Sequence, residues 1–188
     1  MRVISGKARG RNLLTREGEA TRPTADYFKE VLFDCLQFSV PESRFLDLFS
    51  GSGAIAIEAL SRGAAEAVLV EADREAQGCI RKNLENTGLG ASARLLAMKA
   101  EEALTLLKRE GKRFDFIFMD PPYRKGFPEQ ILALSPEELL VPDGVLIVEE
   151  AADADFAHPG WELVKEKHNK VTRLSFLQYT GEVTDSGN

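Results

Sequence analysis

The sequence predicts an α/β protein with a doubly wound, mostly parallel β-sheet, and two observations lead to this prediction. From residue 45 onward, short apolar runs typical of strands alternate with amphipathic runs typical of helices. The apolar runs are continuous rather than interrupted at every second residue, which indicates strands covered on both faces. A chain of 188 residues is long enough for one such domain and too short for two.

A short β-hairpin and a helix are expected before this alternation begins. Residues 2–14 hold two strand-like runs around a turn region bounded by Gly6 and Gly10, which favours a hairpin. Thr24 is in a position to cap a helix, and apolar residues then recur at spacings of three and four up to Phe38.

The remaining elements follow in a regular order. The expected strands are 45–49, 67–70, 93–98, 114–119 and 144–149, and the expected helices are 54–62, 73–87, 101–110 and 128–134, with a turn or helix at 136–140. Strands at 161–167 and 171–179 would add an antiparallel hairpin at one edge of the sheet. Ligands of such sheets bind at the carboxyl ends of the strands. Functional residues are therefore expected directly after residues 49, 70, 98 and 119.

The composition is that of a globular protein outside the membrane. Hydrophobic residues make up 44% of the chain and charged residues 29%, as in an ordinary globular protein. No apolar run approaches the roughly 20 residues that span a bilayer, and the N-terminus does not read as a secretory signal. We therefore expect a cytoplasmic protein, working as a monomer and away from membranes. Cys35 and Cys79 are widely spaced in helix-like surroundings, which favours reduced thiols and no metal site.

Charge is distributed unevenly along the chain. The net charge is −6, yet residues 1–22 hold six bases and two acids, which leaves 18 bases and 28 acids for the other residues. A basic arm on an acidic body can dock phosphate locally, although a merely solvated terminus would have the same composition. The expected organisation is a basic arm at 1–22, a catalytic domain at 23–180 and a flexible tail at 181–188.

The segment that follows the first strand has the composition of a cofactor-binding turn. Gly51 and Gly53 let backbone N–H groups approach a ligand at the start of a helix, whose N-terminus is electropositive. Glu71 ends the second strand, where a carboxylate can accept both hydrogen bonds of a ribose diol. After the third strand, Ala100 and Glu101 are expected to contact an adenine, although Glu101 also suits the first turn of a helix.

Two cofactor classes fit this turn. The spacing of Gly51, Gly53 and Glu71 satisfies the dinucleotide fingerprint and so keeps an NAD-dependent oxidoreductase open. Asp47, however, would repel a pyrophosphate and attract an ammonium group. S-adenosylmethionine carries an ammonium, a sulfonium and a ribose, so acids at 47 and 71 favour it as the cofactor.

The tetrapeptide Asp120-Pro121-Pro122-Tyr123 follows the fourth strand and predicts chemistry on an amine. An exocyclic base amine is a poor nucleophile because its lone pair is delocalised into the ring. The Asp120 carboxylate and the Pro121 carbonyl can each accept a hydrogen bond from one of its N–H groups and so restore the lone pair to the nitrogen. The prolines hold that carbonyl rigidly. Tyr123 offers a flat face to a base swung out of its stack. The alternative is a structural Pro-Pro turn with a packed tyrosine.

With these motifs in place, the chain resembles a known family, the RsmD-type bacterial 16S rRNA guanine-N2 methyltransferases. The resemblance covers about residues 2–179 and includes two patterns specific to the family, besides the two motifs above. These patterns are Arg2-x-Ile4-x-Gly6-x-x-x-Gly10-Arg11-x-Leu13 and Arg22-Pro23-Thr24-x-Asp26, with Lys29-Glu30-x-Leu32-Phe33 after it. Departures occur at Tyr27-Phe28 and at Asn169.

The resemblance implies a Rossmann-like class I fold, S-adenosylmethionine as methyl donor and 16S rRNA in the small ribosomal subunit as substrate. It places Thr24, Phe49, Ser52 and Ala72 with the cofactor residues named above. It also implies RNA contacts from the N-terminal region, at Lys7, Arg9, Arg11 and Arg22.

Other interpretations stay open at this stage. Alternating positions on a strand would put Arg9 and Arg11 on one face, where both can meet phosphate. The Asp-Pro-Pro-Tyr motif serves an adenine-N6 methyltransferase of DNA or RNA equally well, and a noncatalytic RNA-binding protein could keep the fold. The acidic run 149–153 is interpreted as a solvated loop.

Overall fold

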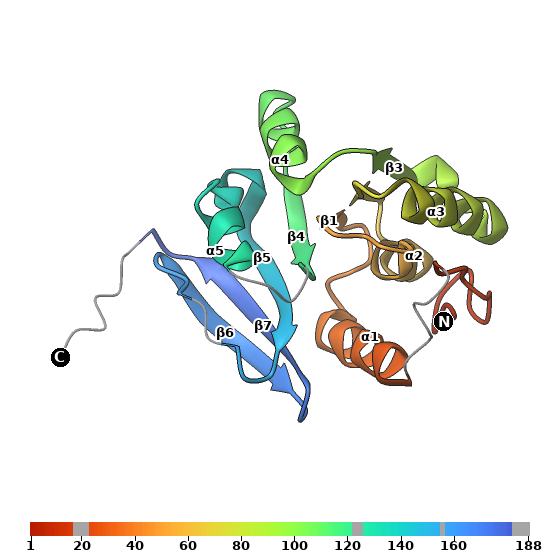
Figure 1. The fold of residues 1–188 in the computed structure, drawn as a ribbon, viewed down its shortest axis with the longest axis horizontal. Coiled ribbons are helices and arrows are strands. Elements are labelled where there is room, and N and C mark those ends of the chain that lie inside the picture. Colours follow the sequence, from red (N-terminus) through yellow and green to blue (C-terminus); the bar gives the residue numbers. More distant parts are fainter. Residues whose placement is uncertain (17–22, 122–125, 155–156, 182–188) are drawn as a thin grey trace.

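Seven strands form one mixed sheet in the computed structural model, which describes residues 1–16, 23–121, 126–154 and 157–181. The strand order is β3-β2-β1-β4-β5-β7-β6 (Figure 1). The strands are β1 Arg44–Asp47, β2 Glu66–Val70, β3 Ala93–Leu96, β4 Phe114–Met119, β5 Leu140–Ala151, β6 Trp161–His168 and β7 Thr172–Tyr179. The first five are mutually parallel, and β7 runs antiparallel to β5 and β6. The expected sheet and its C-terminal antiparallel hairpin are therefore confirmed.

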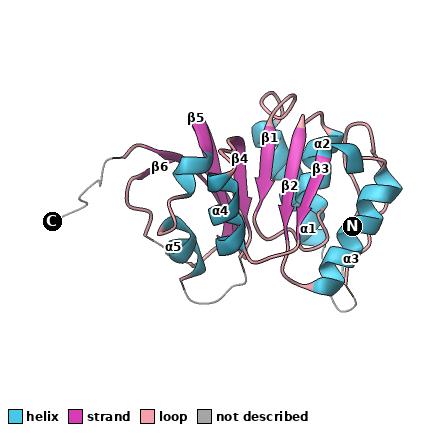
Figure 2. Cartoon of the chain, turned by 90° about the horizontal axis from the view of Figure 1, so that it is seen from above, coloured by secondary structure: helices cyan, strands magenta, loops and turns pink. Residues whose placement is uncertain are grey.

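Helices cover both faces of this sheet, as a doubly wound fold requires (Figure 2). They are α1 Pro23–Leu36, α2 Ala54–Ser61, α3 Arg74–Thr87, α4 Ala100–Arg109 and α5 Phe127–Leu132, with 3-10 turns at Gly90–Ser92 and Pro136–Leu139. No helix in the described part of the chain is both long and apolar enough to cross a membrane.

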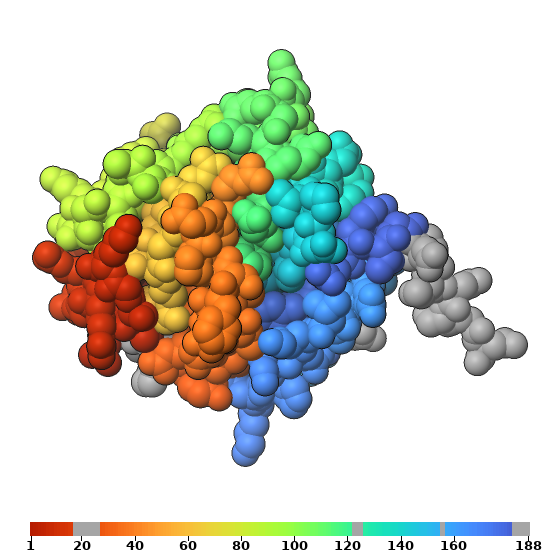
Figure 3. Space-filling view, turned by 180° about the vertical axis from the view of Figure 1, so that it is seen from behind, coloured from red at the N-terminus to blue at the C-terminus, as the bar shows by residue number. Residues whose placement is uncertain are grey.

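The N-terminal segment is more compact than a regular hairpin. A single antiparallel bridge joins Arg2 to Asn12, and the chain between them curls through turns. The segment lies against the body of the domain (Figure 3, red), and its Val3, Ala8 and Leu13 are buried in the core. The expected hairpin is therefore present in shortened form: three backbone hydrogen bonds join residues 1–3 to residues 10–13, and neither side is long enough to form a regular strand.

Arg9 consequently lies in a turn and does not alternate with Arg11 along a strand. Both side chains are nevertheless exposed. The reason is local: Gly6 and Gly10 both have positive φ, which turns the chain away from an extended path.

A buried carboxylate fastens this segment to α2. Glu58 is fully buried and accepts the backbone N–H groups of Ile4 and Ser5 at 2.8 and 3.0 Å. It also pairs with the buried ammonium of Lys29 on α1, at 3.5 Å, and with Arg62 at 2.8 Å. A fully partnered buried charge of this kind ties three segments together, because removing any partner leaves an uncompensated charge.

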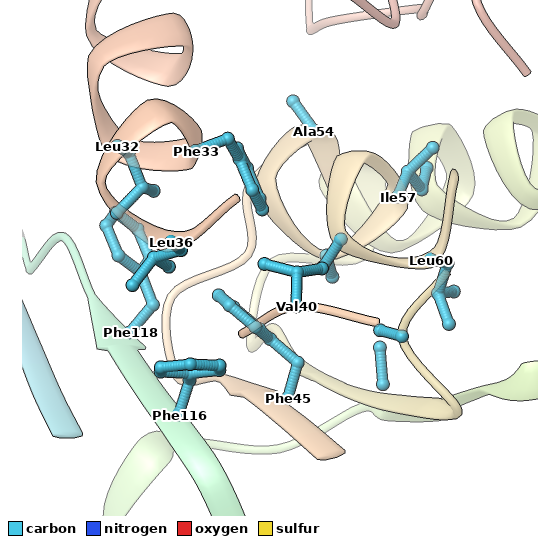
Figure 4. Packing of buried hydrophobic residues seen from close by; sticks show 14 of the residues in the cluster. Leu32, Phe33, Leu36, Val40, Phe45, Ala54, Ile57, Leu60, Phe116 and Phe118 are labelled. Atoms are coloured by element: carbon cyan, nitrogen blue, oxygen red, sulfur yellow. The ribbon is translucent and has the colours of Figure 1, made fainter. Parts of the chain in front are cut away.

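The core is divided by the sheet into two apolar clusters. One cluster joins α1 and α2 to the strands through Leu32, Phe33, Ile57, Phe45 and Phe116 (Figure 4). The other joins α4 and α5 to the opposite face of the same strands. Side chains alternate between the two faces of a strand. The cluster to which a strand residue belongs therefore shows which face of the sheet it occupies.

Several boundaries differ from those expected, and the two at the first helix and at the acidic run bear on the site. The first helix begins at Pro23 and ends at Leu36, so Thr24 lies inside it rather than capping it, and its side chain lies outside the described residues. The acidic run is wrong as a loop, because β5 continues through it as far as Ala151. It does so because β7 pairs with β5 along this stretch, and Arg173 of β7 neutralises the buried Glu150 at 2.7 Å.

A glycine-to-alanine pair tests how closely the N-terminal segment packs. A Cβ on Gly6 would lie 1.8 Å from the Ser61 carbonyl oxygen, whereas one on Gly10 meets nothing within 4 Å, and both residues have φ near +80°. We expect Gly10→Ala to lower the free energy of unfolding by about 1 kcal/mol through backbone strain alone. Gly6→Ala should cost about 2–4 kcal/mol, since overpacking adds to the strain. Urea denaturation measures both, and equal losses would contradict the close approach.

Candidate active site

A cavity of about 570 Å³ opens at the carboxyl ends of β1, β4 and β5, where the fold class places its ligands. Helix α1 and the start of α2 form its other walls. The lining residues that the sequence motifs singled out are Asp47, Phe49, Gly51, Ser52, Glu71, Asp120 and Pro121. The structure therefore brings the loop after β1 and the loop after β4 into one cavity.

Strand register explains why acids gather in this cavity. Asp47 stands beside Phe118 of β4, and Phe118 stands beside Ile147 of β5. Two residues further along, Asp120 and Glu149 extend the row defined by Phe118 and Ile147, because alternate residues share a face of the sheet. All three carboxylates line the cavity on the face covered by α1 and α2.

Asp47 is a fully buried carboxylate that lacks a well-formed partner. Its exposed fraction is 0%, and neither side-chain oxygen makes a hydrogen bond within the described part of the chain. Burial raises its pKa from the ordinary value to about 7, and the charges of Asp120 and Glu71 add to the rise. The Phe49 amide and the Ser50 hydroxyl lie close to the carboxylate and lower its pKa in part, although neither forms a hydrogen bond with it. An unpaired acid in this position favours a cationic ligand.

Glu149 is the third acid of the row, at the end of β5. Its burial, together with the charges of Asp120 and Asp47, raises its pKa to about 8. Because the pKa values of Asp47 and Glu149 are both raised, these carboxyl groups retain protons more readily than ordinary acids when no ligand is bound. A bound cation would displace these protons.

Glu71 and Gly51 are joined by a hydrogen bond across the turn that follows β1. One carboxylate oxygen of Glu71 accepts the Gly51 N–H at 2.8 Å, and the other accepts the Asp73 N–H at 2.8 Å. The Gly51 amide thus orients the acid, and Glu71 retains further lone pairs for a ligand hydroxyl. A diol ligand would have to share this carboxylate with the backbone.

Gly53 serves packing more than ligand approach. Its φ of +81° begins α2, and a Cβ there would lie 3.0 Å from the Leu69 side chain and 3.3 Å from Ile80. Gly51 also has positive φ, but it lines the cavity and a Cβ on it would meet nothing within 4 Å. Glycine is therefore required at position 53 for close packing and at position 51 for its backbone conformation beside the cavity.

Two cations and an apolar wall complete the cavity. Lys29, bound to Glu58 and to the Arg2 carbonyl, and Arg16, 3.5 Å from Asp73, reach it from the N-terminal side. Apolar side chains from α1, α2 and the strands form the remaining surface. Among them, Phe49 packs edge-on against Phe127 of α5, with ring centroids 6.2 Å apart. The cavity thus suits an organic ligand that carries positive charge near the acids.

Several expected site residues lie elsewhere. Ala72 and Glu101 are outside the set that lines the cavity, as is the buried Ala100, and Glu101 occupies the first turn of α4. The side chains of Lys7, Arg9 and Arg11 project from the N-terminal segment into solvent. Arg22 and Tyr123 lie outside the described residues.

Sequence reasoning missed Glu149, Lys29 and Arg16. Glu149 follows the apolar run of β5, so the rule that sites lie at strand ends could have identified it. Lys29 belongs to one of the family patterns, but its spacing fits any amphipathic helix, and only the folded chain places it in the cavity wall.

Comparison with known proteins gives a consistent result. The family model described as conserved hypothetical protein 95 matches residues 1–178. The chain is 36% identical to ribosomal RNA small subunit methyltransferase D of Haemophilus influenzae, with 95% of this chain and 93% of the relative covered. It is 35% identical to the protein of the same name from Escherichia coli K12, over 89% and 84%.

Solved structures agree with the sequence relatives. The Escherichia coli protein yhhF superimposes with a TM-score of 0.84 at 32% identity, covering 97% of this chain and 99% of that one. A hypothetical protein of Thermus thermophilus gives 0.81 at 34%, covering 94% and 98%. A more distant chain that was solved with SAH gives 0.66 at 16% identity, over 79% and 48%, and shares the fold.

The raised pKa of Asp47 predicts a pH-dependent effect on stability. Below about pH 4 the carboxyl is protonated in the folded and the unfolded chain, so it contributes no difference. Between about pH 4 and pH 7 the unfolded chain ionises first, and the folded protein loses stability, by roughly 4 kcal/mol at most. Asp47→Asn removes this loss.

We therefore expect Asp47→Asn to unfold at a higher temperature than the wild type at pH 8, and at nearly the same temperature at pH 4. Thermal denaturation of the ligand-free protein across this range checks the result. Asp153→Asn, at an exposed acid, is the control and should show no such trend. A difference in unfolding temperature between Asp47→Asn and the wild type that stays constant from pH 4 to pH 8 would contradict the raised pKa.

Proposed function

The chain belongs to the conserved hypothetical protein 95 family, the RsmD family, and from that premise we propose that it methylates the N2 amine of a guanine in 16S rRNA with S-adenosylmethionine as donor. The relatives' name supports methyl transfer to small-subunit rRNA. The observation that carries the proposal is the row of three carboxylates, which sets a site for a cation beside a site for an amine.

The residues of the cavity fit the donor. Asp47 has two buried oxygens without a hydrogen bond in the described chain, and an ammonium group would satisfy them. Glu71 would accept from the ribose, with Gly51 and Ser52 beside it, and the ring of Phe49 would give an apolar contact. When bound, S-adenosylmethionine supplies an electrophilic methyl group on a positively charged sulfur. The acids of the cavity would favour binding of a donor that carries this charge.

Asp120 and Pro121 would hold the amine that receives the methyl group. Both line the cavity at the end of β4, next to the β1 loop. The carboxylate of Asp120 and the carbonyl of Pro121 would each accept a hydrogen bond from one N–H group of the amine. These hydrogen bonds would draw the lone pair out of the ring and direct it at the donor. Tyr123 follows in the same motif, and we assign it the stacking contact with the base.

Glu149 has a role that follows from proton balance. When the nitrogen forms its bond to the methyl carbon and the sulfur–carbon bond breaks, the nitrogen becomes positively charged and must lose a proton. Glu149 lies beside Asp120 on the same face of the sheet. We assign the ionised Glu149 as the acceptor, since a carboxylate with a pKa near the working pH is a better base than an ordinary one.

The identity of the base is the finest part of the proposal. An adenine N6 amine presents the same two N–H bonds, and the motif serves either base. Guanine N2 is favoured by the RsmD-specific patterns in the N-terminal region, where Lys7, Arg9, Arg11 and Arg22 are proposed to contact RNA. Nucleoside analysis of small-subunit RNA from cells that lack the gene separates the two: loss of N2-methylguanine supports guanine, and loss of N6-methyladenine overturns it.

Asp120→Ala tests the amine site. We expect methyl transfer to small subunits to fall by about a hundredfold or more, because one of two acceptors for the amine is lost. Donor binding, measured by calorimetry, should persist. Asp153→Ala at an exposed acid is the matched control and should keep full activity. Unchanged turnover of Asp120→Ala would remove Asp120 from the mechanism.

Glu149→Gln tests the proton acceptor through the pH profile. In the wild type, kcat/KM should rise with pH up to about 8, because Glu149 must be ionised in the free enzyme. The variant should lose at least about tenfold at pH 8, and its kcat/KM should level off at a lower pH than in the wild type, because glutamine does not titrate and only Asp47, with a pKa of about 7, still ionises there. Donor affinity measured separately shows whether binding is also affected. A variant with the wild-type profile would exclude this role.

A further inference from the structure

A second hollow of about 410 Å³ lies between α1 and β6. Helix α1 contributes mainly Tyr27, Phe28, Val31 and Asp34, and β6 contributes Lys165, Lys167 and His168. We call this set the α1–β6 groove. In Figure 3 the orange surface of α1 borders the blue surface of the C-terminal hairpin.

The groove and the cavity are neighbours that share one lining residue. Phe28 lines both hollows, and it is buried with 5% of its surface exposed. A strand that lies in the groove would therefore lie next to the cavity, on the same helix. An extended substrate needs such a neighbouring surface when only one of its units enters the cavity.

The two lysines of the groove point to the same side of the sheet as the catalytic acids. Lys165 pairs with Phe176 and Lys167 with Leu174 in the register of β6 and β7, and both partners belong to the core cluster under α1 and α2. Both lysines are exposed and have no ion pair within the described part of the chain. Glu166, between them, lies 3.9 Å from Arg173 and so is partly neutralised.

An exposed aromatic ring stands opposite these cations. Tyr27 has 53% of its surface exposed, and its ring contacts Phe28 edge-to-face with centroids 5.7 Å apart. The edge contact anchors the ring while most of it stays accessible. Exposed aromatic rings beside lysines are the combination that binds single-stranded nucleic acid, with stacking on the ring and phosphates on the cations.

We propose that the α1–β6 groove binds the RNA strand that flanks the target nucleotide. Tyr27 stacks on a neighbouring base, and Lys165 and Lys167 contact successive phosphates. Lysines two positions apart on a strand are about 7 Å apart, so each can meet a different phosphate. This inference rests on the proposed function and extends it, since it assigns RNA contacts to the C-terminal hairpin, far along the chain from the basic N-terminal segment.

Charge complementarity identifies the occupant as RNA. The chain carries a net charge of −6, so a groove lined by two lysines and one acid, Asp34, has the opposite sign to the chain as a whole. Phosphates are the partner that such a local excess of positive charge selects.

The test combines two substitutions with a matched control. Lys165→Ala/Lys167→Ala removes the cations, and Arg81→Ala/Lys82→Ala removes two exposed cations from α3, which packs beside β3 at the opposite edge of the sheet. The substrates are small ribosomal subunits and their purified 16S rRNA, from an Escherichia coli strain that lacks its own methyltransferase D. The readouts are the KM for RNA, the salt dependence of RNA binding, and donor binding by calorimetry.

We expect Lys165→Ala/Lys167→Ala to raise the KM for both substrates on the order of tenfold and to reduce the slope of log binding constant against log salt by about 1.4. Donor binding should not change. Tyr27→Ala should weaken RNA binding about fivefold or more, and Tyr27→Phe should restore it, because stacking needs only the ring.

Each other outcome overturns the proposal in a recognisable way. If the wild type methylates RNA and Lys165→Ala/Lys167→Ala behaves like the control, the groove has no part in binding RNA. If the variant is impaired on assembled subunits but normal on purified rRNA, the groove binds a ribosomal protein instead. If the wild type methylates neither substrate, the proposed function fails and takes the groove assignment with it.

Discussion

The alignment of three adjacent parallel strands is the constraint on which the site depends. Because β1, β4 and β5 are in register, every second residue faces α1 and α2, and the first positions beyond the buried phenylalanines and isoleucine are occupied by Asp47, Asp120 and Glu149. The sheet is rigid, so the acids are held close together whether or not a ligand is bound. Their mutual repulsion is a cost of the fold that a cationic ligand relieves.

Two buried carboxylates show how the chain separates stability from function. Glu58 and Asp47 are both 0% exposed. Glu58 is surrounded by two backbone N–H groups, Lys29 and Arg62, and it binds the N-terminal segment to the domain. Asp47 has no hydrogen bond from the described residues and faces the cavity. A saturated buried charge serves structure, whereas an unsaturated one at a strand end favours a ligand.

Much of the fold follows from the sequence because its signals are local. Continuous apolar runs gave the strands, and Asp73 and Gly88 mark the ends of α3 as capping rules require. The loops at Asp47 and Asp120 could be placed together because strand ends share one edge of a sheet. The length of β5 could not be predicted, because its last residues extend the strand only by pairing with β7, which lies more than 20 residues further along the chain. An acidic run is polar by composition whether it is solvated or paired.

Glu149 and Glu150 make this dependence on context concrete. They are neighbours in β5, and they face opposite sides of the sheet. Glu150 is neutralised by Arg173 from β7, while Glu149 enters the cavity. The same antiparallel hairpin that supplies Arg173 also carries Lys165 and Lys167 beside α1. The C-terminal hairpin therefore extends β5 past Glu149 and borders the acidic cavity with a groove that holds two lysines. Under the proposed function, this arrangement would draw a polyanion towards a cavity that itself favours cations.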